Sequence, residues 1–393
     1  MYFSKKAQWF FEPKGETYLN PKNPNLIKLS IGNPPPEGYP VERIKAISEQ
    51  ILSEEPASVL DYSESAGMES FRRAIGAFLN RRGEVIAKPG DTIAITTGAQ
   101  QAIFLAVQLF CDDGDTVLVE DPTFMVALDT IKSGGGVPVG VKMDEDGINL
   151  EDLERKMAAT PKPRLLYIIP DFQNPTGITM SEHKRREVCR LAYKYDIPVI
   201  EDNPYYELRY DGSFIPFVKY YDEHDMVALT SSMSKIVAPG MRLGYVVAGG
   251  KMGEGFERMK TAVDFHSNSW AQRVCCRLLE EGMDDDIKAL RELYGRRGRL
   301  MVSCLEKHCH PAVTFTRPQG GMFIWVTMPK GVDVRAFAAE LLDMGVMVLT
   351  GGQFYAAGGE NCTSFRLSYS LCREEDIEKA IAMIGRLTYK YCE

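Results

Sequence analysis

Apolar and polar residues follow two alternating patterns over the first two thirds of the chain. One pattern is helical: in residues 65–83 the apolar side chains recur at helical spacing and stop at Gly83, and helices are also expected at 99–110 and 181–195. The other consists of short apolar runs that end in turn residues, which predict strands at 91–98, 115–122, 163–171, 197–202, 226–232 and 242–249. Strands that alternate with helices indicate parallel βαβ units and a sheet covered on both faces.

The pattern changes near residue 275. A long charged helical stretch leads to an apolar run at 320–329 and then to another helix. Two more apolar strands follow at 345–351 and 364–370. We expect a smaller α+β domain of residues 1–45 and 276–393 beside a large α/β domain of residues 46–275.

Composition and charge narrow the class of protein. The 393 residues are 45% hydrophobic and 25% charged, as in ordinary globular proteins. The net charge of −8 argues against a nucleic-acid-binding surface, and no run reaches the roughly 20 apolar residues of a membrane helix. The first eleven residues lack the apolar core of a signal peptide, and the nine cysteines form no C-x-x-C pair. We therefore expect reduced thiols and a cytoplasmic location. His308-Cys309-His310 lacks further ligands nearby, so we expect no metal site.

Polar residues follow the expected strands at the points where they end. In open α/β sheets, ligands bind outside the carboxyl ends of the strands. Ala99 and Gln100 follow Gly98 at the start of a helix, where free backbone N–H groups and the helix dipole attract an anion such as phosphate. An ordinary glycine turn before a helix explains the same residues equally well. Asn174 and Asp202 each follow a buried strand, although an aspartate there is often only a cap or turn residue.

The stretch SSMSKIVAPGMRLGY, residues 231–245, combines a phosphate-binding pattern with a nucleophile. Ser232 and Arg242 can bind a phosphate together, the arginine with two nitrogens. Lys235 then lies beside that phosphate as a potential amine nucleophile. Pyridoxal 5′-phosphate needs a lysine for its Schiff base, a carboxylate beside its pyridine nitrogen and anchors for its phosphate. These residues, together with Asp202, predict a site for pyridoxal phosphate.

The sequence resembles the fold-type I, class I/II aminotransferases over most of its length. It is most similar to the subgroup of aminoadipate, kynurenine and aromatic aminotransferases and the related domain of MocR-type regulators. The matching stretches, in order, are LDYSESAG, TTGAQQA, EDPTF, FQNPTG, VIEDNPYYEL, SSMSKIVAPGMRLGY, VDFHSN and FRLSYS. The resemblance implies an α/β fold of the fold-type I PLP-dependent transferases. In that fold, a large domain with a mostly parallel seven-stranded sheet lies beside a smaller α+β domain.

The resemblance also implies roles for single residues around the cofactor ring. Lys235 joins the cofactor and, once substrate frees it, moves a proton between the substrate's α-carbon and the cofactor. Asp202 pairs with the pyridine nitrogen, and Asn174 and Tyr205 contact the ring oxygen. Phe124 stacks on the ring face, where many relatives carry tyrosine or tryptophan.

Further residues correspond to phosphate and substrate contacts in the resembling family. The phosphate contacts implied are Ala99, Gln100, Ser232, Ser234 and Arg242, joined by Tyr62 from a neighbouring subunit of a homodimer. Arg366 corresponds to the arginine that binds the substrate's α-carboxylate, with Asn174 beside it. Gly32, in LSIGNPPP, lies in the segment that covers the substrate in such enzymes.

Three of these residues have ordinary structural alternatives. Tyr62 can be a core or interface tyrosine without a phosphate contact, and Phe124 can simply pack after a proline. Arg366 lies in an alternating strand pattern and can pair with a surface carboxylate.

We expect a pyridoxal-phosphate-dependent aminotransferase. It would move an amino group from an L-amino acid to a 2-oxo acid in a ping-pong mechanism, and the resembling family implies 2-oxoglutarate as this acceptor. We expect no nucleic-acid or membrane partner. The motifs do not separate this enzyme from a C–S β-lyase, because both reactions begin with removal of the α-proton. A non-catalytic cofactor-binding sensor is a third alternative. It is disfavoured because such regulators carry a basic winged-helix domain ahead of this fold, whereas this acidic chain reaches LSIGNPPP by residue 29. The donor is not specified, beyond a lean towards aromatic or long aliphatic side chains.

Overall fold

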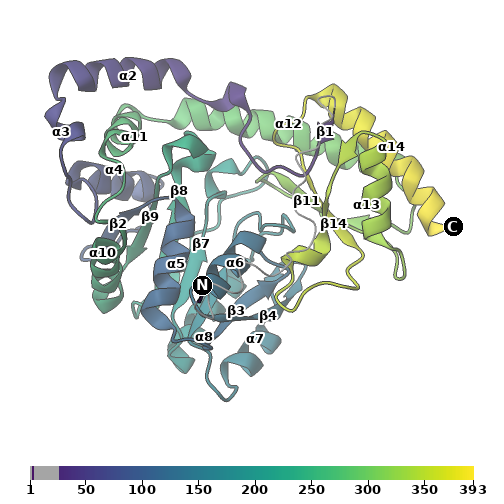
Figure 1. Ribbon diagram of the computed structural model, residues 1–393, viewed down its shortest axis with the longest axis horizontal. Helices are drawn as coiled ribbons and strands as arrows, with labels where there is room; N and C mark the ends of the chain where they lie inside the picture. Colours follow the sequence, from purple (N-terminus) through teal and green to yellow (C-terminus); the bar gives the residue numbers. More distant parts are fainter. Residues whose placement is uncertain (1, 4–25) are drawn as a thin grey trace.

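The computed structural model describes residues 2–3 and 26–393, whose strands form one large and two smaller sheets (Figure 1). The large sheet has the order β2-β9-β8-β7-β6-β3-β4-β5. Its strands are β2 (Thr92–Thr96), β3 (Thr116–Asp121), β4 (Val137–Asp144), β5 (Gly147–Ile148), β6 (Leu165–Ile168), β7 (Val199–Asp202), β8 (Val227–Ser232) and β9 (Gly244–Ala248). Neighbours from β8 to β4 pair in parallel, and β9 is antiparallel to both β2 and β8. The mostly parallel seven-stranded sheet is confirmed, with the two-residue β5 added antiparallel at one edge.

Side chains of the large sheet alternate between two covered faces, as the strand pleat requires. Val117 and Val119 of β3 pack in one core and Leu118 packs in another. The first face is covered by α5 (Ala99–Phe110), α6 (Met125–Ser133) and α10 (Gly250–Asp264). The second is covered by α4 (Glu69–Asn80), α7 (Leu150–Met157), α8 (Glu182–Tyr195) and α11 (Ser269–Glu281). The same alternation in β6 puts Tyr167 on the α5 face, which matters for the site below.

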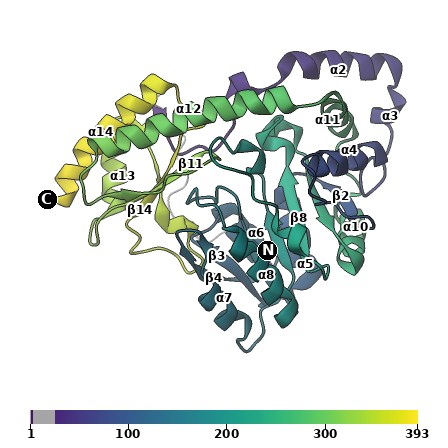
Figure 2. The same ribbon diagram turned by 180° about the vertical axis from the view of Figure 1, so that it is seen from behind.

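The smaller unit is built on a four-stranded antiparallel sheet of order β10-β11-β14-β13. Its strands are β10 (Thr314–Phe315), β11 (Phe323–Thr327), β13 (Leu349–Thr350) and β14 (Ser364–Ser368). Its helices are α12 (Asp284–His308), α13 (Val334–Asp343) and α14 (Glu374–Cys392), and α12 runs along the top of the molecule from the large unit to α14 (Figure 2). The strand β1 (Ile27–Lys28) pairs with β12 (Val346–Met347), which fixes residues 27–29 to this unit.

The remaining helices are short or lie at the edge. They are α2 (Val41–Glu54), α3 (Ala57–Leu60) and α9 (Val218–Tyr221), with the 3₁₀ turns Pro36–Gly38, Tyr206–Leu208, Met233–Lys235, Pro239–Met241 and Gly351–Phe354. One apolar core connects the two units, since it includes Ile103 of α5, Tyr294 of α12 and Phe323 of β11.

The division after residues 45 and 275 stays a prediction; both positions fall inside helices, α2 and α11. Part of the predicted small domain, residues 1 and 4–25, lies outside the described residues. Within the described part of the chain, no helix has the length and apolar character needed to cross a membrane. The same part holds no group of three or more His, Cys, Asp or Glu side chains arranged for a metal ion.

Candidate active site

A cavity of about 480 Å³ lies where the carboxyl ends of the large-sheet strands face β11 and β14 of the smaller unit. This is the edge at which open α/β sheets bind their ligands. The predicted site residues that line it are Gly32, Ala99, Gln100, Phe124, Asn174, Asp202, Tyr205, Ser232, Ser234, Lys235, Arg242 and Arg366. The fold therefore brings together every predicted site residue except Tyr62.

One end of the cavity is suited to an anion. The helix α5 begins there at Ala99, and its first backbone N–H groups have no intrahelical acceptor. Gly98 precedes it with φ +76°, and a Cβ at this position would lie 2.7 Å from Nη2 of Arg242. The hydroxyls of Ser232 and Ser234 are 2.8 Å apart at the same end. The positive helix end, the guanidinium and the two hydroxyls fit the phosphate of the predicted cofactor.

Lys235 follows β8 and lines the cavity. Its Nζ donates a hydrogen bond to the carbonyl oxygen of Gly32 at 2.8 Å and lies 6.0 Å from the centroid of the Tyr205 ring. The pKa of the Lys235 amine is lowered to about 8, chiefly by burial and also by the positive charges of Arg366 and Arg242, while the Asp202 carboxylate acts in the opposite direction. A lowered amine pKa makes the neutral, nucleophilic form accessible near neutral pH.

Asp202 ends β7, and its buried side chain lies in the cavity wall. Its Oδ2 accepts a hydrogen bond from the Tyr167 hydroxyl at 2.7 Å, whereas its Oδ1 has no hydrogen-bond partner among the described residues. Burial raises the pKa of the Asp202 carboxyl to about 6, against the effects of the Tyr167 hydrogen bond and the Lys235 charge. Buried acceptors are rarely left unpaired, so the free oxygen suits a ring N–H of a bound cofactor.

Arg366 reaches the cavity from β14 on the opposite side. Its Nη1 donates to Oδ1 of Asn174 at 2.7 Å, and its Nη2 donates to the carbonyl oxygen of Ser30 at 2.6 Å. Its guanidinium carbon lies 4.2 Å from the centroid of the Phe323 ring. The side chain is only 4% exposed, so the alternative in which Arg366 pairs at the protein surface is wrong. Arg366 and Asn174 come from the two units of the fold and meet through this hydrogen bond.

The aromatic residues of the site have a packing role as well as a place in the cavity wall. Phe124, at the start of α6, lines the cavity and also packs against the apolar core of the α5 face. Tyr205 is buried, and its ring meets that of Phe323 edge to face at 5.8 Å. Burial raises the pKa of the Tyr205 hydroxyl, and the Asp202 carboxylate raises it further, so this hydroxyl stays protonated at neutral pH.

Tyr62 lies apart from the cavity and is 85% exposed. Its ring contacts Phe265 and His266 edge to face, with centroid distances of 5.8 and 5.9 Å. Leu60, two positions earlier in the sequence, and Phe265, which the Tyr62 ring contacts, are also exposed. The alternative of a core tyrosine is therefore wrong, and Tyr62 belongs to the surface of the subunit.

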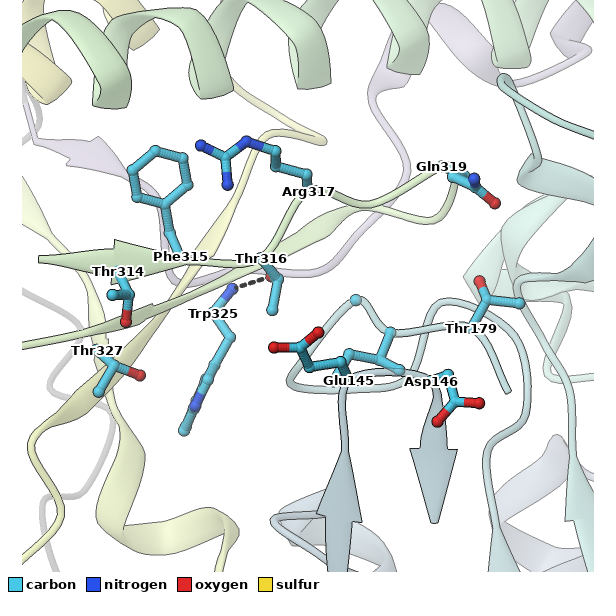
Figure 3. A pocket seen from close by; sticks show the side chains of 12 residues that line it. Glu145, Asp146, Thr179, Thr314, Phe315, Thr316, Arg317, Gln319, Trp325 and Thr327 are labelled. Carbon is cyan, nitrogen blue, oxygen red and sulfur yellow. Dashed lines mark hydrogen bonds between the residues drawn. The ribbon is translucent and has the colours of Figure 1, made fainter. Parts of the chain in front are cut away.

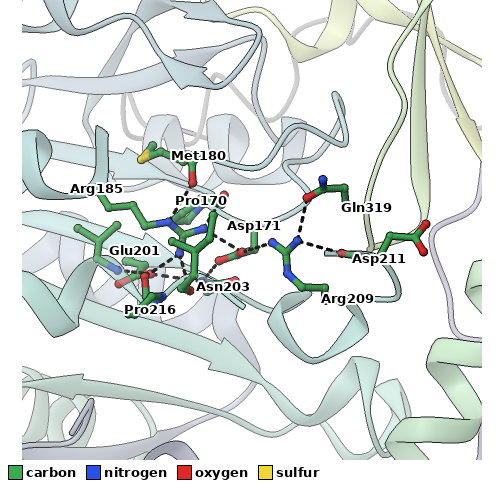
Figure 4. Close-up of polar contacts among 12 residues, drawn as sticks. Pro170, Asp171, Met180, Arg185, Glu201, Asn203, Arg209, Asp211, Pro216 and Gln319 are labelled. Carbon is green, nitrogen blue, oxygen red and sulfur yellow. Dashed lines mark hydrogen bonds and ion pairs between the residues drawn. The ribbon is translucent and has the colours of Figure 1, made fainter. Parts of the chain in front are cut away.

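A buried polar network supports the loops that carry Asn174 and Asp202 (Figure 4). Asp171 accepts hydrogen bonds from Arg185 at 2.9 Å and from the Asn203 side chain at 2.8 Å. Arg209 reaches the same carboxylate at 3.5 Å and donates to Oε1 of Gln319 at 2.9 Å. Because Gln319 belongs to the segment that enters β11, the network joins the cofactor side of the site to the smaller unit.

A second cavity, of about 560 Å³, lies between the β4–β5 turn and the strands β10 and β11 (Figure 3). Two of its charged side chains already have partners: Asp146 pairs with Lys184 at 2.7 Å and Arg317 pairs with Glu306 at 3.1 Å. The first cavity instead presents Lys235 and a free oxygen of Asp202, so we place the functional site there.

Sequence reasoning missed several residues of this site. Ser30, Asn33, Met125 and Phe323 line the cavity, and Tyr167 lies beneath it. Tyr167 left one usable signal, since a tyrosine inside the apolar run LLYII must find a partner for its hydroxyl. The other residues had none, because their place in the cavity depends on contacts between distant parts of the chain.

Comparisons with known proteins identify the family of this chain. The sequence pattern of the family described as "Aminotransferase class I and II" matches residues 24–384. The chain is 34% identical to aromatic-amino-acid aminotransferase 1 of Thermococcus litoralis, over 98% of this chain and 93% of that protein. It is 30% identical to 2-aminoadipate transaminase of Thermus thermophilus, over 93% of this chain and 90% of that protein.

The fold also matches solved structures of this family. The crystal structure of kynurenine aminotransferase from Pyrococcus horikoshii, in complex with PMP, has a TM-score of 0.94 and 31% identity, over 100% of this chain and 98% of that chain. Since the family match spans nearly the whole chain, this protein belongs to the class I and II aminotransferases and is a pyridoxal-phosphate-dependent aminotransferase.

Proposed function

We propose that Lys235 is the catalytic residue of this aminotransferase and that Asp202, Asn174 and Tyr205 bind the cofactor ring. The observation that supports this most is the convergence of the Lys235 amine, the free Oδ1 of Asp202 and the Arg366 guanidinium on one cavity. Pyridoxal phosphate, when bound, carries the amino group between the two half-reactions and accepts the electrons of the broken α-C–H bond.

The protein's own groups would hold the cofactor at both ends. The backbone N–H groups of Ala99 and Gln100, with Ser232, Ser234 and Arg242, would bind the phosphate. The ring would lie over the α5 face of the sheet, with Phe124 stacked on it. Asp202 would keep a negative charge beside the ring nitrogen, and so favour its protonated form.

Lys235 would move the proton. With its pKa lowered to about 8, roughly a tenth of the amine is neutral at pH 7 and able to accept a proton from the substrate's α-carbon. The hydrogen bond from Nζ to the Gly32 carbonyl shows that the amine reaches the segment that would cover the substrate.

Arg366 and Asn174 would bind the α-carboxylate of the substrate. The guanidinium is buried over the Phe323 ring, and its hydrogen bonds to Asn174 and to the Ser30 carbonyl hold its orientation. We propose an L-amino acid donor and 2-oxoglutarate as the acceptor in a ping-pong exchange. The names of the relatives refer to aromatic amino acids and aminoadipate, and the aromatic wall of Phe124, Tyr205 and Phe323 suits aromatic or long aliphatic donors.

We also propose a homodimer in which Tyr62 contacts the phosphate bound by the partner subunit. Its exposed ring, remote from its own subunit's cavity, supports this. Mixing Lys235→Ala and Tyr62→Ala subunits tests it, since a mixed dimer then has one site without either substitution. Activity should return to about a quarter of wild type, the statistical share of intact sites. No recovery would mean that Tyr62 acts within its own subunit. A cytoplasmic location is proposed because all nine cysteines are free thiols.

A single half-reaction tests the proposed activity. The protein loaded with pyridoxal phosphate is mixed with individual L-amino acids, without a 2-oxo acid, and its absorption spectrum is recorded. A shift to the pyridoxamine form without pyruvate or ammonia is expected for a true donor, and Lys235→Ala should abolish it. Pyruvate and ammonia that accumulate while the band stays unchanged would establish a C–S β-lyase instead. A band that no amino acid changes, without products, would indicate the non-catalytic sensor.

A further inference from the structure

The two oxygens of Asp202 have different environments. Oδ2 accepts the Tyr167 hydroxyl at 2.7 Å, and Oδ1 has no partner among the described residues. The Asp202 side chain lies at the cavity wall, and Tyr167 lies on its protein side. One oxygen is thus held by the protein and the other is left for a ligand.

Tyr167 is placed for this contact by the sheet itself. It is in β6, where it pairs with Ile200 of β7, two residues before Asp202. The pleat puts Tyr167, Ile200 and Asp202 on the same face of the sheet, under the cavity. Tyr167 is 1% exposed, and the bond to Asp202 is the contact made by its hydroxyl.

A simple explanation is that a buried tyrosine hydroxyl takes the nearest acceptor. That explanation does not account for the second oxygen of Asp202. An ionised carboxylate that is fully buried usually has both oxygens paired, because leaving one unpaired costs desolvation energy. Here the described residues supply one donor only, the Tyr167 hydroxyl, which does not line the cavity.

The charges around Asp202 make this donor important. Lys235 favours the ionised carboxylate, but its amine is to be bound to the cofactor in the loaded enzyme. Glu120, on β3, is fully buried nearby, and burial together with the Asp202 charge raises the pKa of its own carboxyl to about 8, so it provides no hydrogen bond or positive charge for Asp202. Tyr205 lies close to the same carboxylate and is kept protonated by burial and by Asp202. Among these groups, Tyr167 is the one that donates a hydrogen bond to Asp202.

We propose that Tyr167 is a positioning residue for the transamination site: its hydroxyl holds Oδ2 of Asp202, so that Oδ1 faces the cofactor's ring nitrogen and the carboxylate keeps its charge. The inference rests on the proposed role of Asp202. It adds a residue that touches neither cofactor nor substrate and acts through Asp202.

The test measures the affinity of the apoprotein for pyridoxamine 5′-phosphate as a function of pH. This form of the cofactor binds without a bond to Lys235, so the ring contacts dominate. Affinity should fall as the pH drops through a midpoint, and in Tyr167→Phe this midpoint should lie about one to two pH units higher than in wild type. At a pH below the midpoints of both proteins, the variant should therefore bind roughly 10- to 100-fold more weakly. NMR of ¹⁵N-labelled pyridoxamine 5′-phosphate should show a smaller protonated fraction of the ring nitrogen in this variant.

Two comparisons separate positioning from packing. Tyr294→Phe removes a buried tyrosine hydroxyl that has no partner among the described residues, and should leave the pH profile unchanged. Site-specific 3-fluorotyrosine at position 167 keeps the hydroxyl and strengthens it as a donor, so it should lower the midpoint. It also serves as the test if Tyr167→Phe does not fold.

The outcomes distinguish this inference from the proposed function. A pH profile and ring-nitrogen signal unchanged in Tyr167→Phe, with Asp202→Asn strongly impaired, would overturn the role of Tyr167 alone. Wild-type behaviour of Asp202→Asn would overturn the assignment of Asp202 itself. If both hold, Tyr167→Phe should have no further effect in an Asp202→Asn background, because its effect acts through that carboxylate.

Discussion

Removal of Arg185 should destabilise the protein far more than removal of its neighbour Arg186. Arg185 is fully buried and donates to Asp171 at 2.9 Å and to the carbonyl oxygens of Met180, Pro216, Pro170 and Ile215 at 3.0 to 3.4 Å. Arg186 is 59% exposed and pairs with Glu182 one helical turn away. The two arginines thus share a helix and a chemistry but differ in burial.

The magnitude follows from what Arg185→Met leaves behind. Asp171 would keep the Asn203 side chain at 2.8 Å and the more distant Arg209 at 3.5 Å, and four carbonyl oxygens would lose a donor. Breaking a buried ion pair in this way costs about 3–5 kcal/mol, whereas an exposed pair such as Arg186–Glu182 contributes about 0–1 kcal/mol. Urea unfolding followed by circular dichroism should show this gap between Arg185→Met and Arg186→Met. Losses within 1 kcal/mol of each other would refute the reasoning that the network supports the fold.

Three more outcomes are expected. Burial raises the pKa of the Glu120 carboxyl from 4.5 to about 8, so between these pH values the carboxyl is ionised in the unfolded chain but protonated in the folded protein, and rising pH destabilises the fold. Glu120→Gln removes this effect, and the stability it gains over wild type should therefore grow by roughly 3–5 kcal/mol from pH 4.5 to 8. A stability difference in urea titrations that does not change with pH would contradict this. Arg366→Lys loses the two guanidinium nitrogens that can bind a carboxylate together, and kcat/KM for the amino acid donor should fall roughly 10- to 100-fold. Arg373→Lys, in which the exposed ion pair with Asp376 is altered, should stay near wild type. Gly98→Ala introduces backbone strain at φ +76° and a 2.7 Å contact of its Cβ with Arg242, so pyridoxamine 5′-phosphate should bind at least about 10-fold more weakly. Gly90→Ala is the control, because Gly90 also has a positive φ, +93°, but its Cβ would lie in open space. Equal affinities of the two variants would argue against the phosphate site.

The order of strands and helices around the site was predictable because each buried strand ends in polar turn residues. The runs that became β3, β6, β7 and β8 are apolar on both faces, as parallel strands between two helical layers must be. Strand β4 gave a weaker signal, since VPVGVKMD mixes proline, glycine and charge near the edge of the sheet.

The site divides in the same way. Lys235, Asp202 and Arg242 stand out locally, because each has an unusual position relative to a strand end. Arg366 and Tyr62 came from resemblance alone. The hydrogen bond between Arg366 and Asn174 joins residues 192 positions apart, and the contact of Tyr167 with Asp202 depends on the pairing of β6 with β7. No local pattern encodes such contacts, because they arise from the register of strands and the packing of the two units.

We propose above all that Lys235 is the lysine that binds the cofactor. The most direct measurement is to reduce the protein loaded with pyridoxal phosphate with borohydride, which fixes the bond between the lysine amine and the cofactor, and then to map the modified peptide by mass spectrometry. We expect a single phosphopyridoxyl group on Lys235, in the peptide that contains SSMSKIVAPGMR. Modification of another lysine, with Lys235 unmodified, would contradict it.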